Sequence, residues 1–200
     1  QSDEDKKHIL AKLQQALDTI SEGIQTFPKR PELWAHRATI ERALTGITPN
    51  ALPSAIADME QAYQLSPQNP DYGKMLSDLY LKAQQLDRAV FYLSASQTLK
   101  PNDPQLLYNL AQLQVKAGLL AAANVSFTKL LPLVTDASKR TQIEQEKAAV
   151  EKLLAQAGGN TGVDVSAYQR INGNDTSDTS DTSTRPAPAG LELLPTQQTL

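Results

Sequence analysis

The amino-acid sequence predicts an all-α protein built from repeated antiparallel helix hairpins, and three observations carry this prediction. Aromatic residues make up 5% of the 200-residue chain and only nine residues are glycine, which argues against a β-sandwich or β-barrel. Apolar residues recur with the i, i+3, i+4 spacing of amphipathic helices. Three short turns share the pattern Pro-x-x-Pro, at 28–31, 67–70 and 101–104, which indicates a repeated unit.

The first predicted element is a helix over residues 5–26. We expect its apolar side to pack on Trp34 and the residues around it. That side consists of Ile9, Leu13, Ile20, Ile24 and Phe27. Because the segment resembles the second helix of a hairpin, we expect the first helix of that hairpin to precede residue 1. The chain is accordingly expected to be a fragment or a processed product.

Three units follow, at about 31–69, 70–103 and 104–137. Proline at each boundary ends one helix and begins the next, because a helix tolerates proline in its first turn and not in its interior. The second and third units keep a 34-residue register, in which Leu76 corresponds to Leu110. The first unit is five residues longer, and we assign the excess to a helix-breaking loop over 46–53.

These units resemble the tetratricopeptide repeat (TPR), a 34-residue helix-turn-helix unit. The residues that carry the resemblance in the second unit are Gly73, Leu76, Ser77, Tyr80, Ala89, Leu93, Ser96 and Pro101. Those in the third unit are Leu107, Leu110, Ala111, Ala123, Phe127 and Leu130. The resemblance implies a right-handed α-superhelix. Arg37 stands where the family usually has leucine, so we expect the first helix of the first unit to be distorted.

A further amphipathic helix over residues 137–157 is predicted to cap the last unit. Its apolar residues include Ile143, Val150, Leu153 and Leu154, and Gly158 follows as a helix stop. Stacked repeats need a terminal helix with a polar outer side to cover the last apolar face. We expect that polar side to consist of Lys139, Arg140, Gln142, Glu144, Glu146, Lys147, Glu151 and Lys152.

Residues 158–200 are predicted to form an acidic, low-complexity tail outside the TPR domain of residues 1–157. The body is neutral, since residues 1–159 contain 17 basic and 17 acidic side chains. The surplus acidic residues lie in the tail, which includes the triplet run Asp175–Thr184. A segment of this composition buries too little apolar surface to offset the entropy of ordering the chain, so we expect it to be disordered.

Composition and motifs argue against several classes of function. A neutral body lacks the basic footprint of a nucleic-acid-binding protein. The chain has no cysteine and only two histidines, His8 and His36, which are too few for a metal centre built on these ligands. No Gly-rich phosphate loop or nucleophile motif is present, and no apolar stretch approaches about 18 residues. We therefore expect no catalysis, no cofactor and no membrane-spanning helix in this segment.

The TPR resemblance implies a non-catalytic protein-interaction module that holds a partner peptide or helix in a concave groove lined by the first helix of each unit. The groove positions carried over from the family are Thr39, Arg42, Lys74, Asp78, Lys82, Tyr108, Gln112 and Lys116. Four cations and a tyrosine on one inner face favour an acidic or aromatic ligand. The alternative is that these are ordinary solvated helix positions, and the sequence supports both interpretations equally.

Narrower resemblances give further expectations. TPR co-chaperones clamp a terminal carboxylate with Lys, Asn and Arg side chains, but the corresponding residues here are Ala35, Thr39, Met75, Gln105 and Asn109, so the clamp is absent. More loosely, residues 1–157 resemble the soluble C-terminal TPR region of bacterial O-antigen ligase/polymerase-type membrane proteins. As such an accessory domain, the segment would lie in the cytoplasm or at the outer face of a bacterial membrane. A third alternative is self-assembly through the partly uncovered stripe of residues 9–27.

Overall fold

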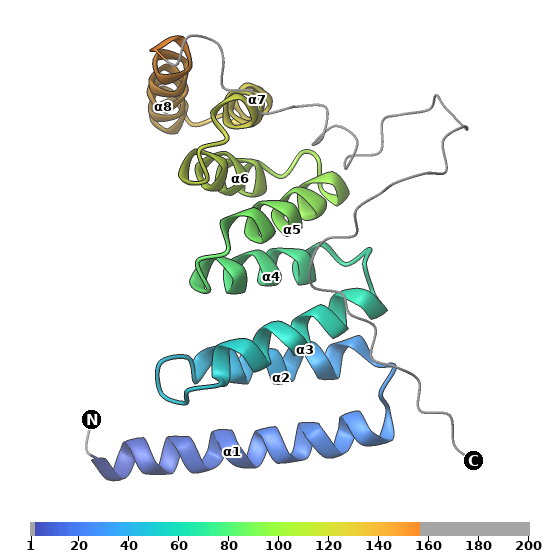
Figure 1. Ribbon diagram of the computed structural model, residues 1–200. Helices are drawn as coiled ribbons and strands as arrows, with labels where there is room; N and C mark the ends of the chain where they lie inside the picture. The colour runs from blue at the N-terminus through green and yellow to red at the C-terminus, as the bar shows by residue number, and fades with distance from the viewer. Residues whose placement is uncertain (1–2, 157–200) are drawn as a thin grey trace, which may run out of the picture.

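The computed structural model describes residues 3–156, and within this range the chain is helical apart from its connections and one isolated bridge (Figure 1). The all-α prediction is confirmed. The elements are α1 (Asp3–Thr26), α2 (Pro31–Ala43), α3 (Ala51–Leu65), α4 (Pro70–Lys82), α5 (Leu86–Leu99), α6 (Pro104–Lys116), α7 (Leu120–Leu130), the 3-10 turn η1 (Leu131–Leu133) and α8 (Ala137–Gln156). None of the helices in this part of the chain combines the length and apolar character that crossing a membrane requires. The acidic tail lies outside the described residues.

Three hairpins form the body of the molecule. Helix α2 packs with α3, α4 with α5, and α6 with α7. The second helix of each hairpin also contacts the helix that follows it, so α3 packs on α4, α5 on α6 and α7 on α8. Figure 1 shows the resulting stack, which runs in chain order from α1 at one end to α8 at the other. The predicted capping helix, α8, thus covers the last hairpin.

Proline fixes the start of the first helix in each hairpin. Pro31, Pro70 and Pro104 are the first residues of α2, α4 and α6, and each of these helices is 13 residues long. The missing N–H of proline has no consequence there, because the first turn has no intrahelical acceptor. Asn69 and Asp103 precede two of these prolines, and their side chains accept hydrogen bonds from backbone N–H groups of the next turn.

The second and third hairpins turn through one residue in the left-handed backbone region. Gln84 has a φ of 60° and Gly118 a φ of 75°, and these positions are 34 residues apart. The N–H of the residue that follows each one donates to a carbonyl five residues back, at 2.9 Å and 2.8 Å. This is the Schellman arrangement that ends many helices. The two connections are therefore the same turn, although only one contains glycine.

Two apolar cores lie along the stack. The first joins α2 to α6 and includes Met59, Leu76 and Tyr80, none of which is more than 1% exposed. The second joins α6, α7 and α8 around the fully buried Phe127, against which α8 contributes Ile143. Helix α6 supplies residues to both cores, so it is the element through which the first two hairpins are connected to the cap.

The first hairpin corrects two expectations. Its connection covers residues 44–50, so Pro53, which we assigned to a loop over 46–53, lies in the first turn of α3. That position tolerates proline for the reason given above. Arg37 does not distort α2, which is a continuous helix. Its guanidinium pairs with the carboxylate of Asp58 on α3, and this partner allows a charged residue at a position where leucine was expected.

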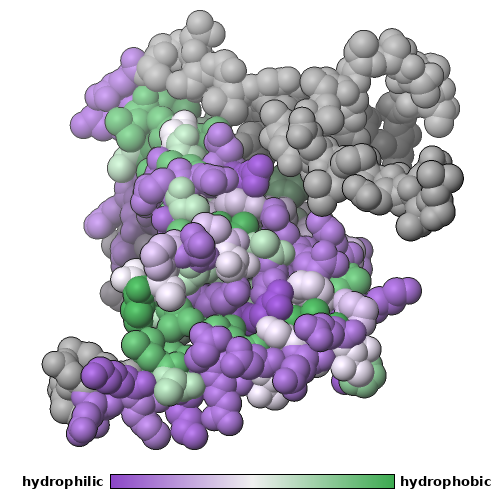
Figure 2. Space-filling model, turned by 60° about the horizontal axis from the view of Figure 1, so that its bottom comes forward, coloured by the Kyte–Doolittle hydropathy of each residue, from purple (hydrophilic) through white to green (hydrophobic). Residues whose placement is uncertain are grey.

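The apolar side of α1 is only partly covered. Ile24 is 6% exposed, whereas Ile9 is 47% exposed and Phe27 54% exposed. The stripe of residues 9–27 is therefore partly uncovered, as the self-assembly alternative supposes, and the N-terminal part of α1 extends past α2 (Figure 1). Figure 2 brings this end of the molecule forward and shows hydrophobic side chains beside the N-terminal end of α1.

Candidate functional site

The groove residues that the sequence predicts lie on α2, α4 and α6, the first helices of the three hairpins. We call the surface that they form, together with the part of α8 that contacts it, the first-helix face. The predicted groove residues on this face are Thr39 and Arg42 on α2, Lys74, Asp78 and Lys82 on α4, and Tyr108, Gln112 and Lys116 on α6. All are exposed or half-buried. The hydroxyl of Thr39 donates to the carbonyl of Ala35 in its own helix, at 2.8 Å.

Three cations lie around Asp78 on this face. Burial raises the pKa of Asp78, while Lys74, Arg42 and Lys82 act in the opposite direction. Arg42 of α2 is therefore close enough to α4 to act together with the two lysines of that helix. All three cationic side chains are exposed, and none forms an ion pair within residues 3–156. Their charges are available to a ligand.

A cation also recurs once per hairpin on the first-helix face. Arg42, Lys82 and Lys116 each lie in the last turn of a first helix. The negative end of the helix dipole stabilises a cation at that position. Because the hairpins are stacked, the three cations follow one another from hairpin to hairpin, and we call them the cation ladder.

Helix α8 covers the other part of the face. The carboxylate of Glu146 accepts hydrogen bonds from the Tyr108 hydroxyl at 3.1 Å and from the Gln112 amide at 2.6 Å. Gln142 donates to the same hydroxyl at 3.5 Å. We expected Gln142 and Glu146 on the solvent side of the capping helix. Gln142 is exposed as expected, whereas Glu146 is half-buried against α6. Tyr108 and Gln112 are thus already engaged within the chain.

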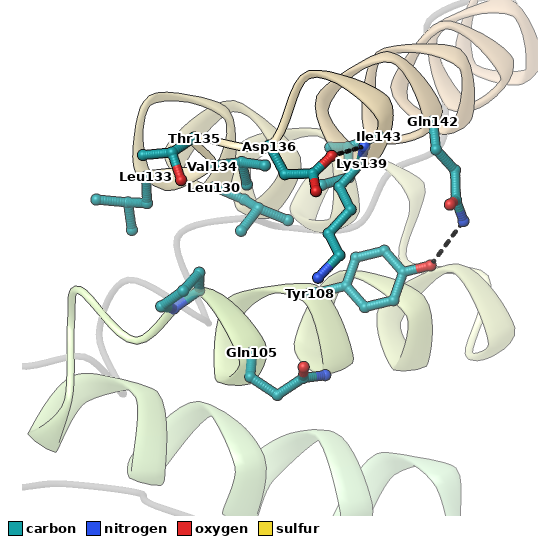
Figure 3. Close-up of a pocket in the computed structure, with 11 residues that line it drawn as sticks. Gln105, Tyr108, Leu130, Leu133, Val134, Thr135, Asp136, Lys139, Gln142 and Ile143 are labelled. Atoms are coloured by element: carbon teal, nitrogen blue, oxygen red, sulfur yellow. Dashed lines mark hydrogen bonds between the residues drawn. The ribbon is translucent and has the colours of Figure 1, made fainter.

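A cavity of about 450 Å³ opens between α6, the connection from α7, and α8 (Figure 3). Figure 3 shows Lys139 of α8 extending toward α6 beside Tyr108. The remaining lining residues are Pro104, Gln105, Leu130, Leu133, Val134, Thr135, Asp136, Gln142 and Ile143. Apolar walls with a few polar groups are typical of binding cavities. Within residues 3–156, no group of three or more His, Cys, Asp or Glu side chains is arranged to hold a metal.

Sequence reasoning missed the contribution of α8 to this surface. Gln142 follows Tyr108 by 34 residues, and Glu146 follows Gln112 by the same interval. The repeat period therefore continues into α8, which takes the place of the first helix of a fourth hairpin. That spacing is the signal in the sequence from which the contacts can be found.

Comparison with solved structures identifies the fold of this chain. No family model and no curated protein matches the sequence. Among solved structures, the MamA protein is similar with a TM-score of 0.58 at 14% identity, over 84% of this chain and 85% of that one. YrrB, described as a TPR protein with an unusual peptide-binding site, gives 0.58 at 15% identity, over 83% of this chain and 87% of that one. This chain has the tetratricopeptide-repeat fold.

A third structure supports the same TPR fold. TTC0263, a thermophilic TPR protein of Thermus thermophilus, has a TM-score of 0.50 at 18% identity, over 72% of this chain and 75% of that one. Likeness at such identities establishes the TPR architecture, and with it the fold class predicted from the 34-residue period. The resemblance to O-antigen ligase/polymerase-type proteins stays a prediction, because none of these matches bears on it.

Proposed function

We propose that this chain is a protein-interaction scaffold that binds an extended acidic segment of a partner protein on its first-helix face. The proposal is carried by the cations of that face that form no ion pair within residues 3–156, namely Arg42, Lys74, Lys82 and Lys116. Asp78 is the one acidic residue among the predicted groove positions. The face therefore has a positive excess on a body that is neutral as a whole, and this favours association with acidic segments.

The cavity between α6 and α8 supports the same proposal by offering an apolar contact. Its apolar wall includes Leu130 and Ile143, and Lys139 lies beside it. A leucine-sized side chain of the partner would bury apolar surface there, at roughly 25 cal/mol per Å². YrrB, which has the same fold, is described as having a peptide-binding site. A ligand with acidic side chains and one apolar anchor thus fits both parts of the surface.

The test uses the full chain and a fluorescent twelve-residue probe of Glu-Gly-Leu triplets, with a Lys-Gly-Leu peptide for comparison. We expect the acidic probe to bind, with binding that weakens as salt is raised. The double variant Lys82→Glu/Lys116→Glu should weaken binding about tenfold or more, because two attractive contacts become repulsive. Fluorescence anisotropy measures the affinity, and circular dichroism checks that the variant stays helical.

A matched control separates the site from net charge. Lys129 is exposed and lies in the last turn of α7, a second helix in the same hairpin as Lys116. Lys129→Glu changes the charge of the chain as Lys116→Glu does, yet it should leave the affinity for the acidic probe nearly unchanged. Equal losses from the two single variants would contradict a site on the first-helix face.

A further inference from the structure

We propose that the acidic run Asp175–Thr184 of this chain docks on its own cation ladder, where it competes with the partner segment. The competition rests on the proposed function, whereas the docking itself concerns this chain alone. Arg42, Lys82 and Lys116 would be the contact residues on the folded body. The run would then act as a built-in competitor that an acidic partner has to displace.

Charge complementarity is the first observation behind this proposal. The run contains three aspartates, Asp175, Asp178 and Asp181, and no basic residue. The cation ladder has three cations without ion-pair partners in residues 3–156. The acidic surplus of the chain and the unpaired cations of its folded body therefore lie in two separate segments, each of which can neutralise the other.

The spacing of the charges is the second observation. The aspartates recur at every third residue. In an extended polyproline II conformation, three residues complete one turn and advance about 9 Å, so the carboxylates lie on one side at that interval. The cation ladder likewise places one cation on each first helix. Both segments therefore present single charges one after another and not in a cluster.

The direction of α8 places its C-terminal end near the cation ladder. Helix α8 runs alongside α6 in the same direction, since their contacts advance together along both helices. Beyond the contact between Gln112 and Glu146, α6 reaches Lys116 and α8 continues to Gln156. The chain therefore leaves α8 at the end of the first-helix face where the ladder lies.

The connecting segment is long enough to reach. Residues 157–174 separate α8 from the first aspartate of the run. A flexible chain of that length has a root-mean-square end-to-end distance of about 25 Å and a fully extended span of about 60 Å. Four packing steps separate α6 from α2, and at about 8–10 Å each they lie within that span. Tethering at this range gives an effective concentration of millimolar order. At that effective concentration, ionic contacts that would be too weak to join separate molecules are sufficient to dock the run on the cation ladder.

The direct test is zero-length carbodiimide cross-linking of the full-length chain at low protein concentration and low salt, followed by peptide mapping of the monomer. We expect amide bonds between the carboxylates of the run and Lys82 or Lys116, and their loss at high salt. Exposed Lys129 on α7 is the internal control and should form few such bonds. Equal cross-linking of Lys129, or links found only between two chains, would overturn the proposal.

Competition provides the second measurement. The variant Asp175→Asn/Asp178→Asn/Asp181→Asn keeps the length of the tail and removes the competing charges. We expect it to bind the Glu-Gly-Leu probe three- to tenfold more tightly than the wild-type chain. The control Asp164→Asn/Glu192→Gln removes acidic charge from the tail outside the run and should change the affinity by less than twofold. An unchanged affinity of the triple variant would count against docking of the run.

The two measurements distinguish this inference from the proposed function. Cross-links to Lys82 and Lys116 in the wild-type chain, without any binding of the probe even by the triple variant, would support the docked run and contradict the partner site. Binding of the probe that depends on Lys82 and Lys116 but not on the three aspartates would support the partner site and contradict the docked run.

Discussion

Arg37 is a half-buried charged residue that lies between the first three helices. Its guanidinium donates to both carboxylate oxygens of Asp58, one of them at 2.6 Å, and to the Ser21 hydroxyl at 3.3 Å. It also lies 5.1 Å from the centre of the Trp34 ring. Asp58 is only 5% exposed, so its charge depends on this partner. One side chain thus connects α1, α2 and α3.

Glu41 lies beside this pair and should make stability depend on pH. The pKa of Glu41 is raised from its ordinary value of 4.5 to about 7, because burial and, to a lesser extent, Asp58 raise it by more than Arg37 lowers it. One of its carboxyl oxygens is buried without a hydrogen-bond partner in the described residues. Because the folded pKa lies above the unfolded value, the native state binds the extra proton between these two values. Its contribution to stability is complete below about pH 4.5 and is lost as the pH rises through 7.

Urea unfolding between pH 5 and pH 8 measures this effect. The midpoint of the wild-type chain should fall across the range, whereas that of Glu41→Gln should change much less, because the variant has no proton to lose. Glu22 is exposed on α1, and Glu22→Gln should keep the wild-type dependence. If Glu41→Gln and the wild-type chain share one profile, the buried carboxyl is not its source.

At the scale of elements, the connections inside the hairpins show where the fold imposes strain. Gln84 and Gly118 have the same left-handed conformation and are both exposed. Glycine adopts this region freely, whereas a residue with a Cβ pays a steric cost. Nothing lies within 4 Å of the position that a Cβ would take on Gly118, so the cost there is confined to the backbone. The second hairpin thus carries a strain that the third avoids.

The corresponding pair of substitutions should act in opposite directions. Gln84→Gly should raise the free energy of unfolding by about 0.5–1 kcal/mol, and Gly118→Gln should lower it by a similar amount. Urea unfolding at constant pH measures both, and unchanged circular dichroism confirms that the helices remain. A loss of stability in Gln84→Gly would mean that the Gln84 side chain contributes more than its backbone strain costs.

At the scale of the whole molecule, stability comes from two apolar cores along the stack and not from a single core. The first core extends from α2 to α6, and the second joins α6 to α8. Contacts run between neighbouring helices, as expected of a repeat protein in which each unit contacts only its neighbours. The two ends of the stack should therefore respond separately to changes in their own core.

Phe127→Ala tests this separation. Phe127 is fully buried in the second core, and its truncation should cost about 3–5 kcal/mol. Hydrogen exchange should accelerate in α6, α7 and α8 before it does in α2 and α3. Met59→Ala, a comparable change in the first core, should give the opposite order. A uniform acceleration over all the helices in either variant would instead show that the stack unfolds as one unit.

The parts of this protein that the sequence determined are those fixed over short distances along the chain. Prolines at 31, 70 and 104 set helix starts, apolar spacing set the buried faces, and the 34-residue period set the repeat. Helix starts and buried faces depend on neighbours within one or two helical turns, and the period is found by aligning the sequence with itself, so all three can be recognised from the sequence alone. The eight groove positions were carried over from family resemblance, and their role in binding stays a prediction.

Only the tertiary structure decided which polar side chains are free and which are engaged. Arg37 and Asp58 are 21 residues apart, and Tyr108 and Glu146 are 38 apart. Whether such residues meet depends on the angle and distance at which helices pack, which follows from the whole set of side chains between them. Helix packing therefore determines that Tyr108 bonds to Glu146 on α8 and that a cavity lies beside it. It also determines that the cation ladder has no ion-pair partner within residues 3–156.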